Sequence, residues 1–227
     1  MLSVKEIYKS IQGETSRAGL PSVFVRLAAC DLRCSWCDSE YAFTGGEMME
    51  LDEVVSKVRE LDARVVTITG GEPLLQDDVF PLISRLADDR RDVLVETSGA
   101  HDIAPIDPRA TVIMDVKCPS SGESKANREA NLANLKSTDE VKFVIASRED
   151  YDWAVRAVRE KKLDEKCHIL FTWAAPVPES AELKPFPEDH RRIGSDELAR
   201  LILSDGLDVR FLPQIHKTIW GETARSR

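Results

Sequence analysis

Residues 64–73 read RVVTITGGEP, and this stretch decides the fold. A short run rich in β-branched residues ends there in two glycines, a glutamate and a proline. Short, continuous apolar runs of this kind are typical of strands buried within a parallel sheet. Comparable runs occupy Ser22–Ala28, Asp92–Glu96, Thr111–Val116, Val141–Ala146, His168–Thr172 and Val209–Leu212. The chain is therefore expected to build a largely parallel sheet.

Between several of these runs, the apolar residues are spaced as they are on one face of a helix. This spacing predicts helices within residues 51–61, 79–86, 151–158 and 198–202. Strands that alternate with helices indicate βαβ units and an α/β fold. Ligands in such folds bind at the carboxyl ends of the strands. Four motifs directly follow strands and are expected to meet there: Cys30–Cys37, Gly70–Pro73, Thr97–Gly99 and Lys117–Ser120.

The composition is that of an ordinary globular protein, with 42% hydrophobic and 31% charged residues among 227. This length fits one domain, or two small ones. The formal net charge of −9 argues against a nucleic-acid partner, whose phosphates are bound by Lys and Arg. No apolar stretch approaches the roughly 20 residues of a membrane span, and residues 1–12 lack the pattern of a signal peptide. We therefore expect a cytoplasmic protein with no membrane partner.

Three of the five cysteines, Cys30, Cys34 and Cys37, lie within eight residues as C-DLR-C-SW-C. Thiolates this close in sequence can converge on one metal centre. Structural zinc sites and electron-carrying clusters normally use four ligands, so a set of three leaves a coordination position open for reaction. The alternatives are unrelated buried thiols, or a structural zinc completed by a distant ligand such as Cys118, Cys167 or a histidine.

The spacing C-x3-C-x2-C, with Trp36 before the last cysteine, resembles the signature of the radical S-adenosylmethionine superfamily. The segment 70–73, GGEP, is similar to the loop that meets the amino group of S-adenosylmethionine in that superfamily. The resemblance implies a 4Fe–4S cluster whose open iron chelates S-adenosylmethionine and whose electron cleaves it to a 5′-deoxyadenosyl radical. In such enzymes the cofactor carries the difficult chemistry, while the protein binds, orients and excludes water.

Two segments, one near each end of the chain, indicate which family within the superfamily this sequence resembles. Residues 7–14 read IYKSIQGE and residues 210–220 read RFLPQIHKTIW. From Val4 to Trp220 the chain resembles the 7-carboxy-7-deazaguanine synthase family, carbon–nitrogen lyases of queuosine and 7-deazapurine biosynthesis. The resemblance implies conversion of 6-carboxy-5,6,7,8-tetrahydropterin to 7-carboxy-7-deazaguanine with loss of ammonia, begun by hydrogen removal at C6. It also implies that S-adenosylmethionine is regenerated and that magnesium is used.

Residue roles follow from the resemblance, position by position. Six positions match substrate contacts: Gln12, Gly13, Glu14, Arg26, Thr97 and His216. The Glu14 carboxylate suits the N–H groups of a guanine-like edge, which need acceptors. The guanidinium of Arg26 suits the substrate carboxylate, which it can bind with two hydrogen bonds.

The resemblance also implies a set of cofactor contacts: Trp36, Cys37, Asp38, Gly70, Gly71, Glu72, Gly99, Lys117 and Ser120. Ser39 matches a magnesium-binding hydroxyl, where many relatives carry threonine. One hydroxyl suffices for such a site, because Mg²⁺ keeps most of its waters and can use substrate oxygens. No protein side chain is assigned to the catalytic step, since the radical comes from the cofactor.

Some segments depart from the family pattern or carry little signal. Many relatives have a Gln-Pro pair near residues 170–176 that approaches the cofactor, whereas this chain has Thr172-Trp173. Whether Trp173 stacks on adenine or packs in the core is open. Ser120–Asn134 is expected to be a mobile loop leading into a helix, and Ala174–Arg192 a long surface excursion. Cys167 is expected to be buried and inert.

For the architecture we expect a partial, open (β/α) barrel of about six parallel strands. Residues 1–227 are expected to form a single domain with family-specific substrate-binding segments at both ends. The resemblance implies a homodimer and a flavodoxin- or ferredoxin-type reductant. Two further hypotheses are an activase that takes hydrogen from a glycine of a partner protein, and a metal-bearing binding module. The QGE and QIHK segments favour a small-molecule substrate over an activase that acts on a partner protein. A metal-bearing binding module would have no use for the GGEP loop.

Overall fold

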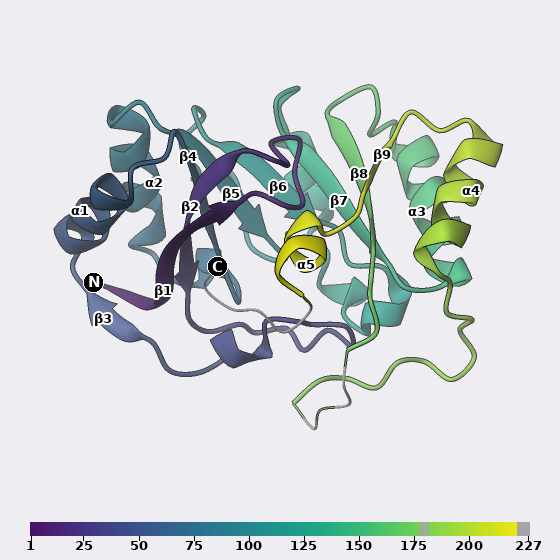
Figure 1. Ribbon diagram of the computed structural model, residues 1–227. Coiled ribbons are helices and arrows are strands. Elements are labelled where there is room, and N and C mark those ends of the chain that lie inside the picture. The colour runs from purple at the N-terminus through teal and green to yellow at the C-terminus, as the bar shows by residue number, and fades with distance from the viewer. Residues whose placement is uncertain (178–179, 181, 222–227) are drawn as a thin grey trace.

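One sheet forms the centre of the structure, a computed structural model that describes residues 1–177, 180 and 182–221 (Figure 1). Its strand order across the described residues is β3-β1-β2-β4-β5-β6-β7-β8-β9. β2 and the strands that follow it in this order all run parallel to one another. These parallel strands are β2 (Pro21–Leu27), β4 (Val65–Gly70), β5 (Asp92–Thr97), β6 (Thr111–Asp115), β7 (Glu140–Ile145), β8 (His168–Trp173) and β9 (Arg210–Leu212). The prediction of an open α/β sheet of parallel strands is confirmed.

Four helices cover one face of this sheet: α1 (Leu51–Leu61), α2 (Val79–Asp88), α3 (Arg148–Lys161) and α4 (Ser195–Asp205). Their apolar residues share one core cluster with alternate residues of the strands, such as Val66 and Ile68 of β4. In Figure 1, α1 and α2 lie at one end of the sheet, and α3 and α4 at the other. Burial of these apolar stripes is what fixes the predicted helices in place.

The other face of the sheet carries the functional residues. Near the amino ends of the strands it holds a small apolar cluster of Val65, Leu94, Ile113 and Leu170. Toward the carboxyl ends, the same face presents polar side chains: Thr69, Glu96, Asp115, Lys142 and Thr172. Thr69, Glu96, Asp115 and Thr172 each lie two or four residues along the strand from a member of the apolar cluster, so the alternation of strand side chains points them the same way. Lys142 of β7 is in register with Asp115 and Leu170, which places it on the same face.

Two strands lie outside the predicted set. β1 (Leu2–Ile11) pairs antiparallel with β2, and β3 (Glu47–Met49) pairs antiparallel with β1. Leu2 and Val4 are buried on one face of β1, so the alternation of apolar and charged residues in this segment is that of an edge hairpin. The pair β1 and β2 carries residues 12–14 to the rim of the sheet.

The segment Ser120–Asn134 does not lead into a helix, and that prediction is wrong. It forms the short 3₁₀ turns η3 (Pro119–Ser121), η4 (Ser124–Ala126) and η5 (Glu129–Ala133). Asn127 hydrogen-bonds to both backbone groups of Lys117, and Asn131 donates to the carbonyls of Gly99 and His101. Asparagine side chains that bind backbone in this way compete with helical hydrogen bonding.

Two further predictions concern the excursion Ala174–Arg192 and the thiol of Cys167. Of the excursion Ala174–Arg192, positions 178, 179 and 181 lie outside the described residues, and Arg192 forms an isolated bridge with Ser147. Cys167 is buried, as expected. Across the described residues, no helix has the length and apolar character needed to cross a membrane.

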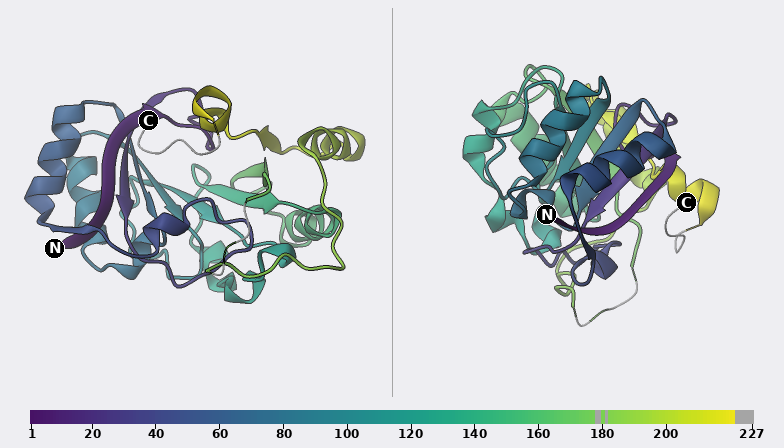
Figure 2. Two further views of the ribbon diagram at one scale, coloured as in Figure 1. Left: turned by 60° about the horizontal axis from the view of Figure 1, so that its bottom comes forward. Right: turned by 90° about the vertical axis from the view of Figure 1, so that its left-hand side faces the viewer.

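One short helix has no counterpart in the sequence prediction. α5 (Ile215–Trp220) follows β9 and lies apart from the four covering helices, beside the turn between β1 and β2 (Figure 2). The backbone N–H of Ile215 donates to the carbonyl of Gly13 at 3.4 Å. The two ends of the chain thus meet at the rim of the sheet.

Candidate active site

The polar end of the inner sheet face borders a cavity of about 510 Å³. The cavity brings together most of the predicted site residues: Gln12, Gly13, Glu14, Arg26, Cys30, Cys34, Trp36, Cys37, Asp38, Ser39, Gly70, Gly71, Thr97, Lys117 and His216. They come from β2, β4 and β5, from the segments that follow β1, β2, β4 and β6, and from α5. A cavity of this size fits a cofactor and a small substrate.

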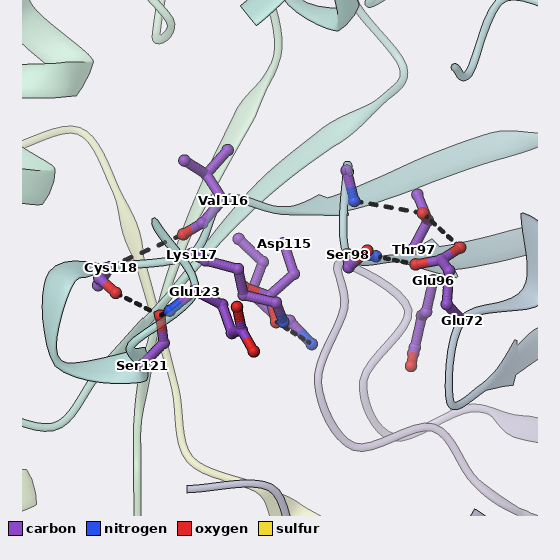
Figure 3. A network of polar contacts seen from close by, with 12 residues as sticks. Glu72, Glu96, Thr97, Ser98, Asp115, Val116, Lys117, Cys118, Ser121 and Glu123 are labelled. Atoms are coloured by element: carbon purple, nitrogen blue, oxygen red, sulfur yellow. Dashed lines mark hydrogen bonds and ion pairs between the residues drawn. The ribbon is translucent and has the colours of Figure 1, made fainter. Parts of the chain in front are cut away.

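Three predicted cofactor residues do not line the cavity. Glu72 is fully buried beneath it, and its carboxylate accepts hydrogen bonds from the Thr97 hydroxyl at 2.8 Å and the Ser98 N–H at 2.7 Å (Figure 3). Gly99 lies at the back, where an added Cβ would meet Met114. Ser120 is fully buried against Asp150. In this arrangement Glu72 holds the turn after β5 to the turn after β4.

The cysteine loop that follows β2 is held in place by its neighbours. The Ser35 hydroxyl donates to the carbonyl of Ser120 at 2.6 Å, and the Ser35 N–H donates to that of Ser121 at 3.1 Å. The backbone N–H of Arg33 donates to the carboxylate of Glu123 at 2.7 Å. The turn η3 therefore serves as a support on which residues 33–35 rest.

Asp150 anchors this support to α3. Its buried carboxylate accepts from the Ser120 N–H at 2.9 Å, from the Ser120 hydroxyl, and from the N–H groups of Ala146 and Ser147. Asp150→Asn replaces an acceptor oxygen with a donor that faces N–H groups. We expect a loss of about 2 kcal/mol in the free energy of unfolding, which lowers Tm by roughly 4–8 °C at this chain length.

Differential scanning calorimetry of the cluster-free protein measures this loss. Asp152→Asn is the matched control, because Asp152 makes only an exposed pair with Arg148 one helical turn away. An Asp150→Asn variant that melts with the control would show that η3 is not anchored through this carboxylate.

The cysteine loop fits a cluster held by three thiolates. Cys30, Cys34 and Cys37 all line the cavity, and burial raises the pKa of each thiol, that of Cys37 to about 12. The Lys117 ammonium opposes this rise at all three thiols, so it favours the thiolates that iron binds. Among the described residues, no group of three or more His, Cys, Asp or Glu side chains surrounds a point closely enough to hold a single metal ion.

The remaining cysteines are engaged elsewhere. The Cys118 thiol is fully buried and contacts the carbonyl of Val116, and the Cys167 thiol contacts that of Leu163. Neither residue lines the cavity. A structural zinc completed by one of these two thiols finds no support in this arrangement.

Gly71 brings the turn after β4 against the cysteine loop. A Cβ at this position would lie 2.1 Å from the carbonyl oxygen of Ala29 and 2.7 Å from the Cβ of Cys30. The N–H of the next residue, Glu72, donates to that same carbonyl at 2.8 Å. Only glycine permits so close an approach, so the GGEP turn and the cysteine loop fix each other's position.

Two buried lysines lie among carboxylates at the carboxyl ends of β6 and β7. Lys117 pairs with Asp115 at 2.9 Å, as Figure 3 shows, and Lys142 pairs with Glu14 at 3.2 Å and with Asp115 at 4.0 Å. Burial works to lower the pKa of both lysines, but the carboxylates outweigh it and hold both values above the ordinary one. Both ammonium groups therefore stay charged at neutral pH.

Arg26 is also buried and paired. Its Nε donates to Glu6 at 2.8 Å, and one Nη donates to the Tyr8 hydroxyl at 3.3 Å. Tyr41 donates to the same Glu6 oxygen at 2.7 Å. These contacts hold the guanidinium at the wall of the cavity, where its remaining N–H donors can meet a ligand.

α5 closes the cavity beside Glu14. The Gln214 amide donates to Glu14 at 2.7 Å, and Nε2 of His216 lies 3.8 Å from the same carboxylate. Burial alone would raise the pKa of Glu14, but Lys142, His216 and Gln214 hold it below its ordinary value. Glu14 is therefore a carboxylate at neutral pH, and a ligand N–H that approaches it meets a charged acceptor.

A second contact from α5 reaches the residues after Cys37. The Lys217 ammonium lies 2.6 Å from Asp38. Burial works to raise the pKa of Asp38, yet Lys217 holds that pKa below its ordinary value. The Ser39 hydroxyl donates to Asp38 at 3.0 Å, which leaves the hydroxyl oxygen as an acceptor toward the cavity.

Several cavity residues received no role from the sequence: Glu96, Asp115, Lys142, Thr172, Gln214 and Lys217. Asp115 and Lys142 could have been found, because a charge inside an apolar run is rarely buried without a partner. Among the described residues, Oδ1 of Asp115 and the hydroxyl of Thr172 are buried without a hydrogen-bond partner. Such polar atoms, left unsatisfied beside a cavity, fit a ligand that supplies the missing bonds.

Thr172 and Trp173 both border the cavity at the end of β8. The Trp173 indole N–H donates to the carbonyl of Ile193 at 2.8 Å. That hydrogen bond fixes one edge of the indole ring to the backbone at Ile193 and leaves part of the ring exposed to the cavity.

Comparison with known proteins defines the class of this one. The family model described as the Radical SAM superfamily matches residues 25–112, which contain the three cysteines and the GGEP turn. The crystal structure of QueE from Escherichia coli aligns with 94% of this chain and 93% of its own, at a TM-score of 0.70 and 19% identity. A crystal structure of Streptococcus suis SuiB aligns with 82% of this chain and 47% of its own, at a TM-score of 0.57 and 14% identity. The fold and the cysteine loop are those of a radical S-adenosylmethionine protein, a class that carries a 4Fe–4S cluster and S-adenosylmethionine.

Relatives of similar length give the particular family. The 7-carboxy-7-deazaguanine synthase of Koribacter versatilis is 43% identical over 96% of this chain and 97% of its own length. That of Chlorobaculum tepidum is 41% identical over 99% of this chain and 96% of its own. The chain belongs to the 7-carboxy-7-deazaguanine synthase family.

Proposed function

We propose that this protein converts 6-carboxy-5,6,7,8-tetrahydropterin to 7-carboxy-7-deazaguanine with loss of ammonia. The observation that carries the proposal is the single cavity that joins the three-cysteine loop to Glu14 and Arg26. One end of the cavity suits a cluster and S-adenosylmethionine, and the other suits a substrate with both a carboxylate and a guanine-like edge.

The cysteine end of the cavity is suited to the cofactors. Bound there, the 4Fe–4S cluster and S-adenosylmethionine would supply the radical chemistry that removes hydrogen from C6 of the substrate. Cys30, Cys34 and Cys37 would ligate three irons, with Lys117 as a balancing charge. The backbone of Gly70 and Gly71 lines the same part of the cavity and can approach the methionine group closely.

The part of the cavity around Glu14 and Arg26 is suited to the pterin. The charged Glu14 carboxylate accepts N–H groups of the guanine-like edge, and Arg26 binds the substrate carboxylate. Gly13 lies under the His216 ring, with no side chain to obstruct it, since an added Cβ would lie 2.4 Å from Nδ1. Gln12 is buried, so its amide acts by holding the loop, through Glu96 and the Glu14 N–H.

Magnesium is proposed to bind at Ser39. The hydroxyl of Ser39 lines the cavity beside Asp38, and its oxygen remains free to accept. A hard cation that keeps most of its water shell needs few protein ligands when the substrate supplies a carboxylate. Held by Ser39, the ion would supply positive charge that stabilises the substrate carboxylate.

The proposal also includes the domain organisation, the oligomeric state, the cellular location and the electron donor. Residues 1–227 act as one domain whose two ends provide substrate contacts, because Glu14 pairs with Gln214 across the cavity mouth. The enzyme works as a cytoplasmic homodimer and receives its electron from a flavodoxin- or ferredoxin-type protein.

The proposal is tested by anaerobic reconstitution of the cluster, followed by incubation with a reductant, S-adenosylmethionine, magnesium and the tetrahydropterin. We expect a product with the mass and ultraviolet absorbance of 7-carboxy-7-deazaguanine, formed with one ammonia per turnover and no net loss of S-adenosylmethionine. Formation of 5′-deoxyadenosine without this product would contradict the substrate. The absence of both, from protein with a complete cluster, would contradict the activity.

A further inference from the structure

Two glutamates reach into the substrate end of the cavity with different partners. Glu14 has a cation at 3.2 Å, the Lys142 ammonium. Glu96, at the end of β5, receives only neutral donors: the Gln12 amide at 3.2 Å and the Thr69 hydroxyl at 3.2 Å. Within the described part of the chain, no ion pair involves Glu96. The two carboxyl groups are therefore in different electrostatic states, although they share one cavity.

The cations near Glu96 are engaged with other carboxylates. Lys142, from β7, pairs with Glu14 and Asp115, while Arg26, from β2, pairs with Glu6. Burial raises the pKa of Glu96, and the neighbouring Glu14 charge adds to the rise; Lys142, the Gln12 hydrogen bond and Arg26 oppose it without cancelling it. Tyr8, from β1, is the other titratable group in this field. One carboxyl group kept charged beside one kept more basic is the arrangement that enzymes use to separate acid and base roles.

We propose that Glu96 is a catalytic residue that moves protons, giving one to the nitrogen that leaves as ammonia and recovering one from a ring carbon. The inference rests on the proposed function and deepens it. Glu96 is next to Thr97 in sequence and is hydrogen-bonded to Gln12, so its carboxyl group lies among the proposed substrate contacts. Because its partners are neutral, it can lose and regain a proton without breaking an ion pair.

The overall reaction requires such a group. The substrate and the product differ by one ammonia. The departing ring nitrogen carries one hydrogen and two bonds to ring carbons, so two C–N bonds break, one C–C bond closes the smaller ring, and two hydrogens pass from ring carbons to the nitrogen. The rearrangement that begins with hydrogen removal at C6 breaks the first C–N bond and forms the C–C bond, which leaves the nitrogen as an amine held by the second C–N bond. In its protonated form, the Glu96 carboxyl group donates its proton to the leaving nitrogen, which departs with the electron pair of the remaining C–N bond. The resulting carboxylate then removes a proton from the ring carbon, and the C–H electron pair becomes part of the aromatic ring. Glu96 ends protonated as it began, and no oxidant or reductant is consumed.

The test compares wild type, Glu96→Gln and Glu96→Asp in the reconstituted assay with substrate deuterated at C6. Glutamine keeps the shape and can accept the Thr69 hydrogen bond, but it cannot move a proton. We expect Glu96→Gln to form product roughly 10²–10⁴-fold more slowly, while deuterium from C6 still passes into S-adenosylmethionine. Glu96→Asp, which keeps a carboxyl group, should recover at least about tenfold of that loss. Glu129→Gln, an exposed carboxylate paired with Lys161, is the matched control and should match wild type.

The pH profile gives a second readout that a purely structural role would not change. Because the protonated form of Glu96 donates first, wild-type kcat should fall as pH rises through the elevated pKa of Glu96, and Glu96→Gln should lack this limb. Product formation by Glu96→Gln within about threefold of wild type would overturn the inference, since it excludes a general acid–base contribution. Loss of deuterium transfer together with product would also overturn it, in favour of a binding role. A wild-type enzyme inert toward the tetrahydropterin contradicts the proposed function itself, and the two failures are thereby distinguished.

Discussion

Cys34→Ala is expected to abolish product formation and cleavage of S-adenosylmethionine. Cys34 is the central member of three thiols that line the cavity, and the two remaining thiols cannot hold three irons. No spare thiol replaces it, because Cys118 is fully buried behind the loop and contacts the carbonyl of Val116. Iron and sulfide content, the visible absorbance of the cluster and the product assay together measure the effect.

Cys167→Ala is the matched control for this substitution. Cys167 is buried at the start of β8 and lies outside the cavity. The change removes one sulfur atom from the core, so we expect a loss of about 1 kcal/mol in stability and full cluster content. If Cys34→Ala kept a complete cluster and turned over, the assignment of this loop to the cluster would be wrong.

Gly71→Ala is expected to lower both the stability and the activity of the protein. The added methyl group would lie 2.1 Å from the Ala29 carbonyl oxygen and 2.7 Å from the Cys30 Cβ. Both obstacles belong to the cysteine loop, and the nearest is backbone, so one of the two loops has to move. We expect a loss of about 3 kcal/mol in the free energy of unfolding, or a Tm lower by roughly 6–12 °C. A displacement of about 1 Å at the reacting centre is expected to reduce kcat by about 10²-fold.

Gly206→Ala separates this steric effect from the general cost of replacing a glycine. Gly206 ends α4 with φ of 60°, and an added Cβ there meets nothing within 4 Å. The left-handed backbone alone costs about 1 kcal/mol, and activity should not change. Calorimetry and the product assay measure both variants. Equal losses of stability, with full activity in Gly71→Ala, would show that the two loops do not fix each other's position.

Features that depend on neighbouring residues could be predicted from the sequence. The parallel strands were recognisable because each is a short apolar run, and the cysteine loop because its three thiols lie within eight residues. The strand-following motifs reached one cavity because parallel strands end at the same edge of the sheet. The roles of Glu14, Arg26 and the other matched positions came from the family resemblance and remain predictions.

Features that depend on distant residues could not be predicted in this way. The alternating segment Leu2–Ile11 forms an antiparallel strand because β2 and β3, which are distant in sequence, pair with it. Lys142 reads as one charge in an apolar strand until Glu14, 128 residues away in sequence, is brought beside it. Glu72, Gly99 and Ser120 matched cofactor positions by motif, yet their surroundings direct them into the support behind the cavity. A motif fixes the order of residues along the chain, but not which side of the backbone faces the ligand.

The pairing of Glu14 with Gln214 has a consequence for the synthesis of this protein. The two residues are 200 positions apart, and the N–H of Ile215 also reaches the carbonyl of Gly13. On the ribosome, the cysteine loop and most of the sheet emerge well before α5, so the nascent chain can hold its metal-binding loop while the substrate end still lacks one wall. The protein can therefore complete its substrate site only late in translation, after α5 has left the exit tunnel. A chain that ends before residue 214 would lack the contacts of Gln214 with Glu14 and of Lys217 with Asp38, and with them one wall of the substrate site.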